Sequence, residues 1–241
     1  MRECGHASVD TQKASPVSEQ DVQLREQIKS YILEHSEPWH REHLGKLTEL
    51  WERWNGEHFA GAMVWPVILL NEPSTPTRFG DCGSVSGIGC RSQIRIRPSL
   101  LTGTHPRVNG ILEGRFLFVS DVLLHEMIHQ WQQEVSGDTD EGYNVHGPAF
   151  RDKANEIGAR LGLPRVRTCK ARGKDKELPS CSHWPHNVRP DNYYLGAYVQ
   201  ASVDKPKSLT VPIDIDRAAK VLRQHFDVDA LVRKLQDGGA A

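Results

Sequence analysis

Apolar residues recur three or four positions apart in two N-terminal stretches of the chain, and each stretch predicts a helix. The clearer stripe lies in residues 40–54, and the sequence Asn55-Gly56 is expected to end that helix. A weaker stripe begins after residues 18–21, whose sequence is typical of a helix N-cap. We expect both apolar faces to pack in the core. The clearer stripe contains Leu44, Leu47, Leu50, Trp51 and Trp54.

Shorter apolar runs between residues 63 and 98 predict strands. Residues 63–70 contain Pro66, which is typical of an edge strand because proline cannot donate to a neighbouring strand. Residues 78–86 and 93–98 are expected to form two further strands joined by a glycine-rich hairpin. The second of them alternates isoleucine with arginine, which predicts one buried face and one basic face.

The most apolar helical stretch, residues 116–135, contains the motif His-Glu-x-x-His. Residues four positions apart share a helix face, so the imidazoles of His125 and His129 can reach one metal ion. Glu126 flanks the first of them without having to bind the metal. A carboxylate in that place can accept a proton from a water molecule at the metal. Zinc is the metal we expect, because neutral imidazoles in a tetrahedral site suit it.

A third histidine follows in the sequence Val-His-Gly-Pro-Ala-Phe. Between His129 and His146, residues 136–142 are rich in glycine and aspartate, so the helix is expected to end and the chain to turn back there. Pro148 is near the start of a further helix that should end at about Leu161. His146 can therefore return to the first two histidines as a third ligand.

Positive charge is concentrated in residues 165–176, although the net charge of the whole chain is only -1. Such a run is usually a solvated linker, and it is also able to contact phosphates. We favour the linker, because no other feature indicates a nucleic-acid-binding fold. The candidate contacts to DNA are Arg165, Arg167, Lys170, Arg172, Lys174 and Lys176.

The chain has five cysteines, an odd number, and no apolar signal region or membrane span. These features predict a cytoplasmic protein with reduced thiols, with association with a nucleoid or nucleus as an alternative and no membrane partner. They disfavour a secreted digestive peptidase. Cys82 and Cys90 are expected to be ordinary thiols. A second zinc site of non-standard spacing is a further interpretation, formed by Cys169, Cys181, His183 and His186.

Residues 45–165 resemble the SprT-like zinc metalloproteases, the family that includes Spartan. The similarity includes residues 50–55, the glycine-rich hairpin, residues 94–101 and the two histidine motifs. It implies an α+β, zincin-like minimal metalloprotease domain, with a small antiparallel or mixed sheet packed on helices, N-terminal helices and a small C-terminal extension. By position it implies zinc held by His125, His129 and His146, with Glu126 as the catalytic carboxylate. It also implies an intracellular endopeptidase; Spartan relatives cut proteins crosslinked to DNA, and many need DNA for activity.

Two alternatives remain open beside this interpretation. Glu156, in an Asn-Glu pair, is similar to the third ligand of another zincin branch, but Arg160 occupies the place where that branch prefers an acid, so we favour His146. In the second alternative, the chain is a nucleic-acid-binding module with a structural zinc and little or no peptidase activity. We expect a zinc-dependent endopeptidase acting on proteins, DNA-associated or DNA-crosslinked ones among them.

The composition also predicts how the chain is divided. Residues 1–17 are expected to be a disordered tail, and residues 18–165 the metalloprotease domain with its N-terminal helices. Residues 166–190 are expected to be a basic linker or a degenerate zinc-binding segment. Residues 191–241 form a C-terminal extension, strand-like at 191–200 and helical at 216–236.

Overall fold

The computed structural model describes residues 19–73, 75, 77–85, 91–111, 114–170 and 173–195. The described residues all belong to one compact unit. The predicted tail at 1–17 and the predicted helices at 216–236 lie outside the described residues.

The two N-terminal helices are α1 (Glu19–His35) and α2 (Pro38–Phe59). The predicted stripe of α2 is confirmed, since Leu44, Leu47, Leu50 and Trp51 are buried on it. The prediction that Asn55 ends this helix is wrong. Its side-chain amide donates to the Met63 oxygen at 3.0 Å and accepts from the Met63 nitrogen at 3.3 Å, so it closes the following loop while its own backbone stays helical.

The described strands form one mixed sheet in the order β1 (Val67–Leu70), β3 (Ser92–Ile96), β2 (Gly80–Ser84). β1 runs parallel to β3 and β2 runs antiparallel to it. The α+β class and the small mixed sheet were expected, and so was the edge position of the first strand. The alternation in β3 is also confirmed: Ile94 and Ile96 are buried, whereas Arg95 forms an ion pair with Asp81 on β2.

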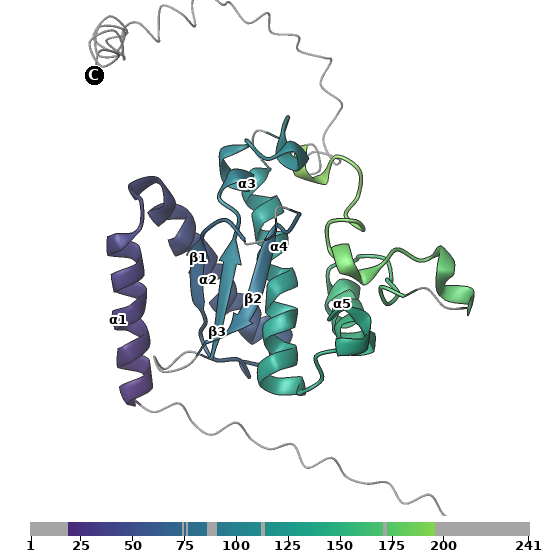
Figure 1. The fold of residues 1–241 in the computed structure, drawn as a ribbon, viewed down its shortest axis with the longest axis horizontal. Coiled ribbons are helices and arrows are strands. Elements are labelled where there is room, and N and C mark those ends of the chain that lie inside the picture. The colour runs from purple at the N-terminus through teal and green to yellow at the C-terminus, as the bar shows by residue number, and fades with distance from the viewer. Residues whose placement is uncertain are drawn as a thin grey trace, which may run out of the picture. The chain divides into compact units, whose positions relative to one another are not determined.

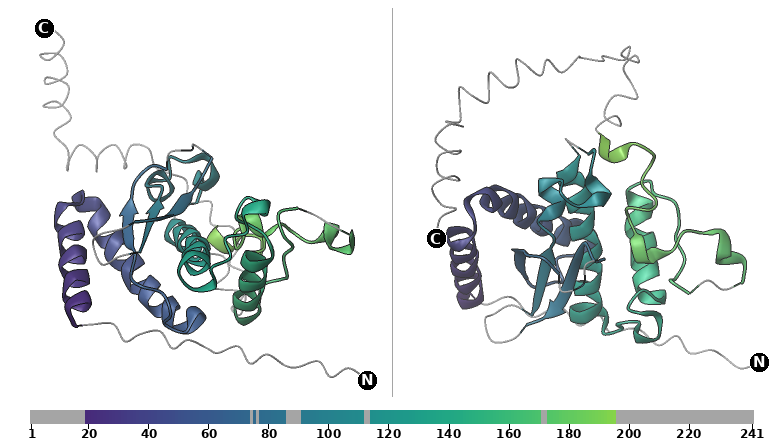
Figure 2. Two further views of the ribbon diagram at one scale, coloured as in Figure 1. Left: turned by 60° about the horizontal axis from the view of Figure 1, so that its bottom comes forward. Right: turned by 45° about the horizontal axis from the view of Figure 1, so that its top comes forward.

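The central helix is α4 (Arg115–Trp131), which contains five of the twelve largest fully buried side chains among the described residues. It lies between the sheet and α2 on one side and α5 (Pro148–Arg160) on the other (Figure 1, Figure 2). The predicted helix at 116–135 is α-helical only to Trp131, and a wider π turn over Gln132–Ser136 ends it. After β3 the chain forms a short helix, α3 (Ser99–Thr102), and a 3-10 turn at Pro106–Val108.

Residues 181–195, which we call the C-terminal strap, pack on the side of α4 that faces α5 (Figure 2). Cys181 and Trp184 are wholly buried there, and Val166 and Val188 belong to the same core. The division suggested at residue 165 is thus one of composition, whereas the hydrophobic core continues across it. The part of the predicted strand at 191–200 that is described forms a 3-10 turn, Tyr193–Leu195.

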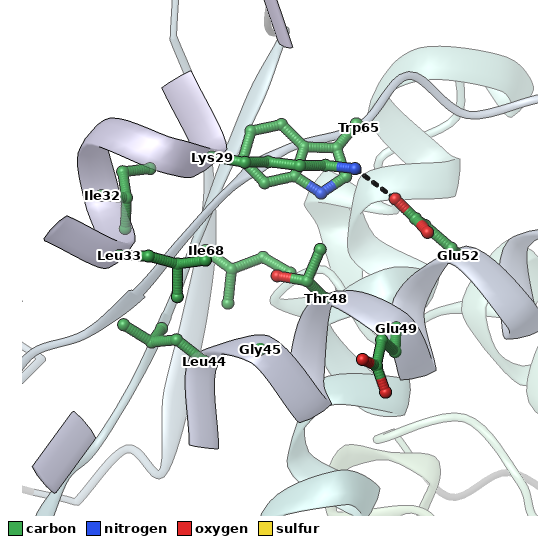
Figure 3. Close-up of a pocket in the computed structure, with 10 residues that line it drawn as sticks. All are labelled: Lys29, Ile32, Leu33, Leu44, Gly45, Thr48, Glu49, Glu52, Trp65 and Ile68. Carbon is green, nitrogen blue, oxygen red and sulfur yellow. Dashed lines mark hydrogen bonds and ion pairs between the residues drawn. The ribbon is translucent and has the colours of Figure 1, made fainter. Parts of the chain in front are cut away.

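A cavity of about 230 Å³ separates part of α1 from α2 and β1 (Figure 3). Its walls are mostly apolar, with Thr48 and Glu49 of α2 also lining it, and Lys29 of α1 forms an ion pair with Glu52 of α2 at its rim. No residue of α4 or α5 lines it, so this cavity is separate from the histidines described below. In the described part of the chain, no helix is long and apolar enough to cross a membrane.

Candidate metal centre

Three histidines from two parts of the chain meet beside α4. His125 and His129 are one turn apart on this helix, and His146 comes from the loop that precedes α5. One ligand atom from each lies within 4.8 Å of the others, and the Nε2 atoms of His125 and His146 are 3.0 Å apart. They are the only group of this kind among the described His, Cys, Asp and Glu residues. The three lie close enough to bind one metal ion.

The other ring nitrogen of each histidine already has a partner. Nδ1 of His125 contacts the main-chain oxygen of Trp184 at 2.6 Å. Nδ1 of His129 contacts Oε1 of Gln132 at 3.0 Å, and Nδ1 of His146 contacts the main-chain oxygen of Asn144 at 2.8 Å. Each partner is an acceptor, so each Nδ1 carries the hydrogen and each Nε2 keeps a lone pair for a metal.

Burial favours the neutral form of these rings. It lowers the pKa of His129 to about 3 and that of His125 well below its usual value, and the neighbouring histidines add to both shifts. Burial lowers the pKa of His146 as well. Two lone pairs 3.0 Å apart repel each other, whereas imidazoles bound to one zinc at about 2.0–2.1 Å hold their nitrogens roughly 3.3 Å apart. The donor set therefore fits a shared divalent cation.

Glu126 lies next to this group and is almost wholly buried. Burial raises the pKa of its carboxyl to about 8, with a further contribution from Asp81. The positive charge of Arg78 opposes that rise, and it also disfavours the protonation of His129. Arg78 precedes β2, so this strand brings an exposed cation to the metal centre that the sequence patterns did not reveal.

Gly80 allows β2 to pass close to Glu126. A Cβ atom at this position would lie 3.2 Å from Cγ of Glu126 and 2.8 Å from the main-chain oxygen of Arg95. It would also lie 2.9 Å from Cγ1 of Val122 on α4, and both this distance and that to Arg95 on β3 are shorter than real Cβ contacts, so any larger residue would push β2 away from α4 and β3. The missing side chain is what lets the sheet edge approach the acid.

The C-terminal strap holds the carbonyl that orients His125. Arg189 of the strap donates two hydrogen bonds to the buried carboxylate of Asp121, at 2.8 and 2.5 Å, and the Tyr194 hydroxyl donates a third at 2.6 Å. Asp121 lies one turn before His125 on α4. The sequence analysis did not single out Asp121, and the one signal it offers is an acid inside an apolar helix, which does not identify Arg189 as its partner.

The residues considered as alternative ligands lie elsewhere. Glu156 accepts from Lys153 at 3.0 Å and from Arg160 at 2.8 Å and is half-exposed on α5. The second zinc site proposed from the sequence does not form a ligand group among the described residues. Its two cysteines instead contact the main-chain oxygen of His146. The backbone N–H of Cys169 donates to this oxygen at 3.0 Å, and the thiol of Cys181 lies 3.5 Å from it.

Comparisons of the chain with protein-family models, with curated proteins and with solved structures gave no match. The functional argument therefore rests on the residues themselves. They define an α+β domain in which three histidines can share a metal ion next to a buried acid.

Proposed function

We propose that this protein is a zinc-dependent endopeptidase of the SprT-like type. The observation that carries the proposal is the convergence of three imidazoles, each with Nδ1 engaged and Nε2 available, beside the buried Glu126. Three protein ligands leave one position open on a tetrahedral ion, which is typical of catalytic zinc, whereas structural zinc usually has four.

Glu126 is the proposed general base and acid. A zinc ion in this site would supply a Lewis acid that polarises a carbonyl group and lowers the pKa of water. Burial raises the pKa of the Glu126 carboxyl to about 8 in the metal-free protein, and the positive charge of a zinc ion beside it would favour the ionised carboxylate that a general base requires. Glu126 would take a proton from the attacking water and pass it to the leaving amine. Arg78 is the proposed stabiliser of the negative charge on the substrate oxygen.

The free edge of β2 favours an extended peptide as the substrate. Among the described strands, β2 pairs only with β3, so its outer N–H and C=O groups are available. An extended segment can add to such an edge through main-chain hydrogen bonds. β2 begins at Gly80, next to Glu126, so a peptide along it would pass the acid. This arrangement supports unfolded protein segments as substrates.

DNA is a proposed partner through the basic residues at 165–176. Arg165 and Lys176 are exposed, whereas Lys170 donates to the main-chain oxygen of Gly142. Lys170 therefore lies against the loop that leads to His146, where a bound phosphate would act close to the metal centre. In the competing hypothesis, a nucleic-acid-binding module with a structural zinc, Glu126 has no role.

The test compares the wild type with Glu126→Gln on a denatured protein, with and without single-stranded DNA. Glu156→Gln is the matched control, because it makes the same substitution at the rival ligand position. We expect peptide release, measured by mass spectrometry, from the wild type and Glu156→Gln only. If the wild type and Glu126→Gln release the same peptides, the peptidase proposal fails. DNA retention without any cleavage would support the binding module.

A further inference from the structure

Asp140 is a buried carboxylate just outside the histidine group. It accepts hydrogen bonds from Nε2 of Gln132 at 2.9 Å, from the backbone nitrogen of Phe150 at 2.9 Å and from that of Ala149 at 3.2 Å. Two of these donors belong to the first turn of α5, where unpaired N–H groups and the helix dipole favour a negative charge. Asp140 therefore joins the end of α4 to the start of α5.

Gln132 transmits this contact to a metal ligand. It is buried, its Nε2 donates to Asp140, and its Oε1 accepts from Nδ1 of His129 at 3.0 Å. A carboxylate only accepts hydrogen bonds, so Asp140 fixes which end of the amide faces it. The amide oxygen is thereby turned toward His129 and holds the hydrogen on Nδ1. One buried charge thus determines which nitrogen of His129 is free.

The same aspartate shapes the loop that carries His146. Its main-chain oxygen accepts from the backbone nitrogens of Tyr143, at 2.8 Å, and Val145, at 3.3 Å. A Cβ atom at Gly147 would lie 2.5 Å from the Asp140 carboxylate, so only glycine fits there. Val145 has a φ of 59°, which is costly for a β-branched residue and persists only where its surroundings impose it.

We propose that Asp140 and Gln132 are positioning residues that set the orientation of His129 and the place of His146, and so control metal affinity. The inference rests on the metal site of the proposed function. Neither residue touches the metal, and both act through the ligands that they hold. Hydrogen-bond partners of this kind typically change metal affinity 10- to 100-fold when they are lost.

The first test is Gln132→Met, which keeps the length of the side chain and removes the acceptor for His129. We expect its zinc dissociation constant to rise about 10- to 100-fold in a competition titration with a chromophoric chelator. Gln133→Met is the matched control, since Gln133 is exposed and contacts Ser84 instead. Its zinc affinity should be unchanged. Circular dichroism of the metal-free proteins shows whether each variant is folded.

The second test exchanges the acid and the amide. Gln132→Glu alone places two carboxylates together and should weaken zinc binding. Adding Asp140→Asn lets the asparagine amide donate to the new carboxylate, which still accepts from His129, while the asparagine oxygen still accepts from the backbone nitrogen of Ala149. The backbone N–H of Phe150 loses its acceptor, because it shares Oδ2 of Asp140 with Gln132. The double variant should therefore recover part of the zinc affinity lost in Gln132→Glu, together with a tetrahedral cobalt absorption spectrum.

The inference is overturned if Gln132→Met binds zinc as tightly as the wild type, or if the double variant binds no better than Gln132→Glu. A wild type that binds no zinc would refute the proposed function itself. Wild-type binding with an unaffected Gln132→Met would refute only the role of Gln132 and Asp140.

Discussion

Replacing Glu126 by glutamine should stabilise the metal-free protein, by an amount that increases with pH. Burial raises the pKa of the Glu126 carboxyl from 4.5 to about 8. A group whose pKa is raised on folding adds stability below its unfolded value, and this stability is lost as the pH rises toward the folded value. The folded protein therefore carries a cost for this acid throughout the range from pH 4.5 to 8.

The cost follows from the difference between the two pKa values. Each pH unit above 4.5 costs about 1.4 kcal/mol until the folded pKa is reached, so the penalty at pH 7 is about 3 kcal/mol. At pH 4.5 it is close to zero. Glutamine has a similar shape and does not ionise. Glu126→Gln should therefore increase the free energy of unfolding by about 3 kcal/mol at pH 7 and hardly at all at pH 4.5.

The assay is urea unfolding of chelator-treated protein at several pH values, followed by the fluorescence of the six tryptophans. Glu156→Gln is the control, because Glu156 is half-exposed and makes its ion pairs on the surface of α5. The free energy of unfolding of Glu156→Gln should differ from that of the wild type by the same amount at every pH, whereas the difference for Glu126→Gln should increase with pH. A Glu126→Gln variant that is less stable than the wild type at pH 7, or shows the same difference at every pH, would refute the reasoning.

Three further predictions concern the surroundings of the site. The pKa of His129 is lowered from 6.5 to about 3, so its stabilising contribution is present above pH 6.5 and falls on acidification, by about 2 kcal/mol at pH 5. Urea unfolding of metal-free Glu126→Gln should show this loss, and a flat profile from pH 7 to 5 would contradict it. Arg189→Met leaves the Asp121 carboxylate buried without its cation and should cost about 3 kcal/mol in the same assay; unchanged stability would be the contrary result. Arg78→Met should reduce kcat by about a hundredfold with KM little changed, and a change in KM alone would remove its proposed role.

The sequence predicted the parts of the fold that depend on local periodicity. His125 and His129 share a face because four residues make about one helical turn, and the stripe of α2 is buried for the same reason. The end of α2 was mispredicted because Asn55 bonds to Met63, a contact that depends on the following loop rather than on helix propensity. The length of α4 was mispredicted in a similar way, since its last turn widens where Gln132 reaches Asp140.

The supporting contacts of the site could not be predicted from sequence patterns. His125 is oriented by a main-chain oxygen of Trp184, and every residue has such an oxygen, so no residue type marks it. Arg78 approaches the site through the position of β2, which depends on Gly80 having no side chain. Both contacts arise from packing between distant parts of the chain. The three histidines that come together were recognisable as candidate ligands because their chemistry and spacing are specific.

The dependence of His125 on Trp184, 59 residues later in the chain, has a consequence for biosynthesis. A nascent chain that has left the ribosome only as far as residue 165 already contains the three histidines and Glu126. It still lacks the carbonyl that fixes the first ring and the Arg189 anchor that holds this carbonyl in place. The candidate metal centre can therefore be completed only after residues 184–189 have been synthesised, so in the proposed peptidase a shorter nascent chain would lack an oriented first histidine.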